Sequence, residues 1–78
     1  MNQCIINVVD KMVFLAFNEI VEEGKIEVLS MDGDTKSLFK LEIKKTNFTN
    51  LRLPSKKGRY KLEIEIDGQH ITKSININ

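Results

Sequence analysis

The chain has very few of the residue types that build catalytic or metal-binding sites. Its 78 residues include one cysteine, one histidine and no tryptophan. One cysteine cannot form an internal disulfide, and it cannot provide the thiolate cluster of a structural zinc site. His70 has neither a nucleophile nor a second imidazole at a recognisable spacing. We therefore expect no metal, no cofactor and no catalytic residue, and the chain is not predicted to be an enzyme.

Long apolar runs and a large net charge are also missing. The longest apolar run, residues 12–17, is far too short to cross a bilayer, and residues 1–7 lack the charged start and apolar stretch of a signal peptide. The net charge is +1, which gives no reason to expect nucleic acid as a partner. With 41% hydrophobic and 29% charged residues, the composition is typical of one globular domain over residues 1–78.

Regular alternation of apolar and polar residues is the strongest positive signal, and it is clearest near the C-terminus. Tyr60, Leu62, Ile64 and Ile66 alternate with lysine and glutamate, and a second alternating segment follows the dipeptide at positions 67–68. That dipeptide, Asp-Gly, favours a type I′ turn because glycine accepts a positive φ without strain. The pattern predicts a β-hairpin with one apolar face and one polar face.

The same criteria mark seven strands between short turn signals along the whole chain. They predict an all-β fold, a single Ig-like antiparallel β-sandwich of about seven short strands. Turns are expected at the glycine-containing and charged segments between them, including 22–24 and 44–46. The predicted strands cover residues 3–9, 12–18, 25–30, 37–44, 47–53, 59–66 and 69–76.

Residues 12–17 are apolar at every position, unlike the other predicted strands. This run fits a strand that is covered on both faces, although periodicity alone also allows a short buried helix. Four of the five aromatic residues, Phe14, Phe17, Phe39 and Tyr60, fall at positions expected to face the core. Only Phe48 is expected as an exposed aromatic side chain, so few stacking platforms for bases or sugars are predicted.

Charge is unevenly distributed along the chain. Residues 19–34 contain six acidic residues and one basic residue, whereas residues 36–61 contain nine basic residues and one acidic residue. One interpretation is a basic surface that meets an acidic partner. The other is a set of solvated strand faces whose lysines discourage pairing between sheet edges. The basic residues selected as a candidate surface are Lys40, Lys44, Lys56, Lys57 and Arg59.

Three smaller features of the sequence are better explained by structure than by chemistry. The Asp32-Gly33-Asp34 segment lacks the ligand spacing of a calcium loop, so a turn is favoured. Two glutamates, at 63 and 65, lie on one strand face and resemble a glycosidase pair in spacing only. Cys4 could carry a lipid or an intermolecular bridge, but a small apolar residue in the first strand is favoured.

From residue 25 onward the order of motifs resembles a known family. The segment 25–33 resembles a strand followed by an "x-D/N-x-x-G" turn, the segment 53–62 is similar to an "L-P-x-G-x-Y-x-h" motif, where h is apolar, and the segment 68–77 resembles a terminal "G-x-x-x-x-x-K-h-x-h" strand. These are features of the C-terminal sorting domains of the type IX secretion system and of related small secreted Ig-like families of anaerobic bacteria. The residues that carry the resemblance are Gly58, Tyr60, Gly68 and Lys73.

This resemblance implies a non-catalytic module of a bacterial secreted or cell-surface protein, acting in protein binding or secretion targeting. The alternative is a standalone intracellular, cytoplasmic adaptor or inhibitor that binds an acidic partner through the basic surface. A carbohydrate-binding module is a third reading, disfavoured by the absence of tryptophan. A protein partner is expected in the first two cases, and exposed sheet edges leave a dimer by edge-strand pairing open.

Overall fold

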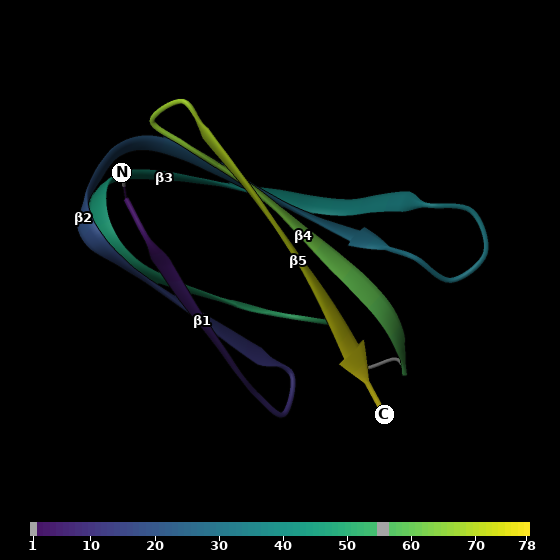
Figure 1. Cartoon of the computed structure of the whole chain (residues 1–78). Coiled ribbons are helices and arrows are strands. Elements are labelled where there is room, and N and C mark those ends of the chain that lie inside the picture. The colour runs from purple at the N-terminus through teal and green to yellow at the C-terminus, as the bar shows by residue number, and fades with distance from the viewer. Residues whose placement is uncertain (1, 55–56) are drawn as a thin grey trace.

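The computed structural model describes residues 2–54 and 57–78, and it contains only β-strands and their connections (Figure 1). The all-β class is confirmed. Within these residues there is no helix with the length and apolar character needed to cross a membrane. The five strands are β1 (Cys4–Val9), β2 (Met12–Ser30), β3 (Lys36–Arg52), β4 (Gly58–Ile66) and β5 (Gln69–Ile77).

All five strands belong to one strongly curled antiparallel sheet, and β2 is its central strand. The first half of β2 pairs with β1 on one side and with the second half of β3 on the other. The second half of β2 pairs with the first half of β3 and with β4, which in turn pairs with β5. Figure 1 shows β2 and β3 bending together, so that the sheet folds back over itself.

The structure has five strands where seven were predicted, because two long strands each include two of the predicted ones. Predicted strands 12–18 and 25–30 both lie in β2, and predicted strands 37–44 and 47–53 both fall in β3, which ends one residue before the second of them. Neither expected turn reverses the chain, because residues 22–24 lie within β2 and residues 44–46 lie within β3. The register moves from Ala16↔Phe48 to Val21↔Thr46, and Lys45 has a φ of 51°. Extra residues on one strand of a ladder redirect the strand sharply without ending its pairing.

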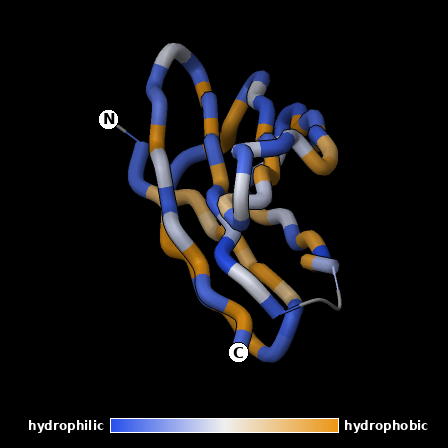
Figure 2. The backbone as a smooth tube through the Cα atoms, turned by 90° about the vertical axis from the view of Figure 1, so that its right-hand side faces the viewer, coloured by the Kyte–Doolittle hydropathy of each residue, from blue (hydrophilic) through white to orange (hydrophobic). Residues whose placement is uncertain are grey.

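The hydrophobic core lies inside the curl, on the inner faces of the strands. Side chains from every strand except β1 contribute fully buried or nearly buried residues, in the alternating pattern that strand geometry imposes. Figure 2 shows this alternation of hydrophilic and hydrophobic residues along the chain. The largest fully buried side chains are Leu15, Ile26, Leu53, Leu62, Ile64 and Ile66.

The turn between β4 and β5 has the predicted type I′ geometry, with positive φ at both Asp67 (44°) and Gly68 (83°). The Asp67 side chain also ties this turn to the bend of β2. Its two carboxylate oxygens accept hydrogen bonds from the backbone N–H groups of Glu22 and Glu23, each at 3.3 Å. The C-terminal hairpin is thereby fixed against the central strand at its turn as well as along its ladder.

The aromatic side chains only partly follow the prediction that four of them face the core. Phe17 and Tyr60 are buried, with 5% and 3% exposure. Phe14 is half-buried on the outer face of the sheet, because the alternation along β2 turns it away from the buried neighbours on either side of it. Phe39 shares the inward direction of its pairing partner Val28 but is 36% exposed, since β3 is an edge strand there.

Candidate functional site

The outer face of β3, β2 and β4 is a surface of mixed charges, most of them opposite in sign to a cross-strand neighbour. Lys25 lies between Glu42 and Glu65 in register, and the next row places a glutamate of β2 between a lysine of β3 and a glutamate of β4. Opposite charges directly across strands stabilise a sheet, each pair by about 0.2–1 kcal/mol. The sign alternates along β2 and β3, whereas β4 contributes a glutamate in both rows, so Glu27 lies opposite Glu63 as well as Lys40.

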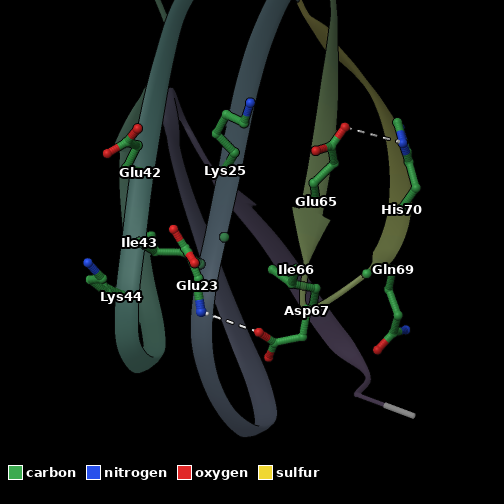
Figure 3. A pocket seen from close by; sticks show the side chains of 12 residues that line it. Glu23, Lys25, Glu42, Ile43, Lys44, Glu65, Ile66, Asp67, Gln69 and His70 are labelled. Carbon is green, nitrogen blue, oxygen red and sulfur yellow. Dashed lines mark hydrogen bonds and ion pairs between the residues drawn. The ribbon is translucent and has the colours of Figure 1, made fainter.

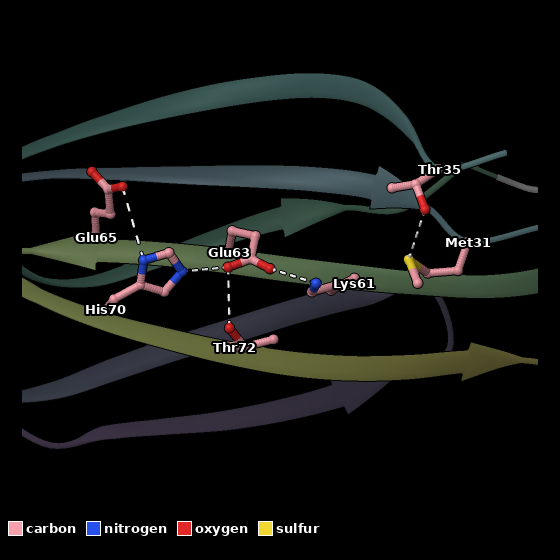
Figure 4. Close-up of polar contacts among 7 residues, drawn as sticks. All are labelled: Met31, Thr35, Lys61, Glu63, Glu65, His70 and Thr72. Atoms are coloured by element: carbon pink, nitrogen blue, oxygen red, sulfur yellow. Dashed lines mark hydrogen bonds and ion pairs between the residues drawn. The ribbon is translucent and has the colours of Figure 1, made fainter.

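Glu63 is the most strongly bonded residue of this charged surface (Figure 4). One carboxylate oxygen contacts His70 Nε2 and accepts a hydrogen bond from the Thr72 hydroxyl at 3.1 Å, and the other lies 2.9 Å from Lys61 Nζ. Its side chain is only 20% exposed. Hydrogen bonds from His70 and Lys61 lower the pKa of Glu63 from 4.5 to about 2.

The cluster around Glu63 has the wrong electrostatics for a general acid. A glycosidase acid needs a carboxyl group whose pKa is raised by burial, whereas the pKa of Glu63 is lowered. Glu65 lies 61% exposed, with its carboxylate 3.9 Å from His70 Nδ1. The hydroxyl of Thr72 bonds to the carboxylate and not to the imidazole. These contacts hold β4 and β5 together rather than activating a nucleophile.

A broad hollow of about 770 Å³ lies beside this cluster, where β2 emerges from its bend (Figure 3). Its floor includes Gly24, Ile43 and Ile66, and charged side chains of both signs surround it. Lys25 and Lys44 line this hollow together with carboxylates from β2, β3 and β4, which outnumber the two lysines. The mixed charges provide no centre of one sign that would select a charged ligand.

The residues of the candidate basic surface are spread over the molecule. Lys40 and Lys44 lie on β3 opposite acidic residues of β2 in register. Lys57 directly precedes β4, and Arg59 lies 3.6 Å from Asp32 in an ion pair. Lys56 is outside the residues that the structure describes. Carboxylates therefore separate the described members of this set.

The four residues that carry the family resemblance lie on the C-terminal hairpin. Gly58 begins β4 and Tyr60 is buried two residues later, while Gly68 lies in the turn at the opposite end. A side chain at Gly58 would meet the Asp32 carboxylate at 2.0 Å, and the φ of Gly58 is +154°. Lys73 is exposed in the middle of β5. The glycines are thus required by local geometry.

The Asp32-Gly33-Asp34 segment forms part of the loop between β2 and β3. Asp32 accepts a hydrogen bond from the backbone N–H of Arg59 at 3.2 Å, which joins this loop to the start of β4. Over residues 2–54 and 57–78, no three His, Cys, Asp or Glu side chains are grouped as a metal site would need. The loop acts here as a connection between strands.

An apolar outer face covers the other part of the sheet, formed by β1, the first half of β2 and the second half of β3. We call this set the outer apolar face. Ile5, Val9 and Phe48 are 64%, 58% and 51% exposed, and the rings of Phe14 and Phe48 stack with centroids 6.5 Å apart. A hollow of about 430 Å³ lies beside Val9 and Phe14. The residues of the outer apolar face are Ile5, Val9, Met12, Phe14, Ala16 and Phe48.

An open seam separates β1 from β5, the two outermost strands of the curl. At one end the backbone N–H of Asn2 donates to Gln69 Oε1 at 2.8 Å, and Gln69 Nε2 donates to the Asn2 carbonyl at 3.0 Å. At the other end Val8, Ile75 and Ile77 line a hollow of about 390 Å³. No Cα atom of β1 comes within 8 Å of one in β5, so no ladder joins these two strands.

Sequence reasoning did not identify Asn2 or Gln69, and it placed Phe14 in the core. Asn2 is buried, and its side chain exchanges two hydrogen bonds with the backbone of Glu19 beside the bend of β2. Amide residues near a terminus carry no signal for such a role. The apolar run 12–17 was a usable signal for the outer apolar face, because alternate residues of a strand face opposite sides.

Comparison with family models, with curated proteins and with solved structures finds no match to this chain.

Proposed function

We propose that the chain is a non-catalytic, Ig-like module that binds another protein through the outer apolar face. The observation that carries this proposal is the contrast between two outer surfaces of one sheet. One is a surface of mixed lysines and glutamates, and the other exposes Ile5, Val9 and Phe48 over half or more of their surface. Contiguous exposed apolar residues of this kind mark interaction sites in folded proteins.

The chemistry of the outer apolar face defines the partner class. The other residues in its three rows are Asn7, Asn50 and Arg52, so the face has one charge and two amides. A partner with a complementary apolar protein surface would bury the stacked phenylalanines, whereas an anionic polymer would find a single cation. Aromatic side chains at the centre of an interface commonly carry most of the binding energy.

The Ig-like description belongs to the same proposal. It is supported by the way β2 and β3 bend, so that each contributes to two facing parts of the curled sheet around one core. The setting we propose is a bacterial secreted or cell-surface protein, acting in protein binding or secretion targeting, as the motif order of residues 25–77 suggests. The intracellular adaptor with a basic surface is less favoured, since Lys40 and Lys44 face acidic partners in register.

The test is affinity capture with the immobilised protein from envelope, medium and cytoplasmic fractions of the source organism, followed by titration of the purified partner. Phe48→Asp is expected to weaken binding at least tenfold, because it places a charge in the apolar contact. Lys40→Glu is the matched control on the charged surface and should bind like wild type. A partner that is lost with Lys40→Glu and kept with Phe48→Asp would refute the proposal in favour of the basic surface.

A further inference from the structure

The open seam between β1 and β5 has the direction that one more strand would need, and no Cα–Cα distance across it is as short as 8 Å. Neighbouring strands lie about 4.8 Å apart, so two strands that flank an inserted one stand roughly 9.6 Å apart. The seam is wider than 8 Å along its length. Asn2 faces Gln69 at one end and Val8 lies with Ile75 at the other, so β1 and β5 run in the same direction and in step.

Because β1 and β5 are parallel to each other, a strand that runs in the opposite direction would form antiparallel ladders with both. Figure 1 shows β1 and β5 running in the same direction, from the upper left to the lower right. Gln69 already imitates such a strand at one end. Its side-chain amide both accepts from and donates to the backbone of Asn2, as the peptide group of a neighbouring strand would.

The core is incomplete along this seam. Elsewhere the buried hydrophobic residues of β2 and β4 are 0–5% exposed, but Cys4, Ile6, Ile71 and Ile77 are only partly buried, and Val8 is 38% exposed. An inserted strand with apolar residues at alternate positions would cover these side chains. Apolar side chains of the inner face are thus exposed on both sides of the seam. An extended segment that adds a strand to these sheet edges would bury them.

Lys73 specifies one further property of the inserted strand. Its register partner is the buried Leu62, so Lys73 lies at an inward position of β5, between Ile71 and Ile75. Within the described part of the chain Lys73 forms no ion pair. A carboxylate at the facing position of an inserted strand would pair with this ammonium group in a partly desolvated setting.

The geometry points to the seam as a binding site for one extended segment of a partner protein, antiparallel to β1 and β5. The segment alternates apolar side chains toward the core and has a Glu or Asp opposite Lys73. This inference rests on the proposed function only in taking the partner to be a protein, since it concerns a different surface from the outer apolar face.

The first test uses a synthetic peptide, Thr-Val-Thr-Val-Thr-Glu-Thr-Val-Thr, blocked at both ends, and a second peptide with lysine in place of the glutamate. Its length matches the nine residues of β5. Wild-type protein is expected to bind the glutamate peptide about tenfold more tightly, and Lys73→Glu should reverse that preference. Lys25→Glu, on the charged outer surface, is the control and should leave the preference unchanged. Equal binding of both peptides to wild type, or no binding of either, would overturn the inference.

The second test attaches the glutamate peptide to the chain after Asn78 through an Asn-Gly turn, which lets the added strand fold back along β5. The occupied seam is expected to slow alkylation of Cys4 at least several-fold relative to a fusion that carries the lysine peptide. Alkylation at the same rate in both fusions would also overturn the inference. Phe48→Asp should leave both readouts unaffected, so failure of the seam and failure of the outer apolar face are separable.

Discussion

Gly24→Ala is expected to destabilise the protein because the added methyl group has no space. Gly24 lies on the inward side of β2 between Ile43 and Ile66 in register. A Cβ atom there would stand 2.8 Å from Ile66 Cγ2, 2.9 Å from the Glu65 carbonyl oxygen and 3.0 Å from Ile43 Cγ1. The carbonyl belongs to the paired backbone of β4 and cannot rotate away, so the ladder itself would have to shift.

Two opposing effects set the size of this loss. Forcing a methyl group into a packed site typically costs about 1–3 kcal/mol. Replacing glycine with alanine returns about 0.4–1 kcal/mol by restricting the unfolded chain. The net loss should be about 1–2 kcal/mol, a sizeable part of the ~4–12 kcal/mol expected for a domain of this length. The midpoint of unfolding in urea should then fall by roughly 0.3–2 M.

The matched control is Gly33→Ala, in the loop between β2 and β3. No atom lies within 4 Å of a Cβ built at Gly33, and its φ is +73°. Alanine therefore meets only the backbone penalty of the left-handed region, about 1 kcal/mol, offset by the same unfolded-state gain. The reasoning would be refuted if Gly24→Ala unfolded at the same urea concentration as wild type, or at a higher concentration than Gly33→Ala.

Two further predictions concern titratable groups. Because the pKa of Glu63 is lowered to about 2, its ionised form stabilises the fold above pH 4.5, and this contribution should be lost as the pH falls from about 5 to 2. Urea unfolding across this range should show a shallower pH dependence for Glu63→Gln than for wild type, with Glu65→Gln resembling wild type; identical slopes for Glu63→Gln and wild type would contradict the assignment. Burial raises the pKa of the Cys4 thiol, so iodoacetamide at pH 8 should modify it several-fold more slowly than in the urea-unfolded chain. Equal rates in the folded and unfolded protein would show that Cys4 is not shielded.

The C-terminal hairpin could be predicted from sequence because its information is local. Alternation over β4 and β5 and the Asp67-Gly68 dipeptide together determine the strands, the turn type and the inward face. The bends of β2 and β3 could not be recognised in the same way. Gly24 and Lys45 have the same chemistry as turn residues, and only the neighbouring strands decide whether the chain reverses or bends.

The candidate surfaces depend still more on tertiary structure. The apolar run of β2 predicts apolar residues on both faces of the strand. It does not show that the outer face is left uncovered by the rest of the chain, which is why Phe14 was expected in the core but is only half-buried. The seam depends on Asn2 and Gln69, which are 67 residues apart. The resemblance to sorting domains stays a prediction, and its glycines have structural reasons of their own in this chain.

The pairing order of the strands has a consequence for how the chain folds. Three of the four ladders, β1–β2, β2–β3 and β4–β5, join strands that follow one another, so each can form by closing a short loop. Among the strands that the structure describes, only β2–β4 joins distant segments, pairing Gly24–Ser30 with Tyr60–Ile66. We expect the docking of the finished β4–β5 hairpin on β2 to limit the folding rate, because it closes the longest loop. Because no ladder joins β1 to β5, folding does not require the still longer loop closure that would bring these two strands together.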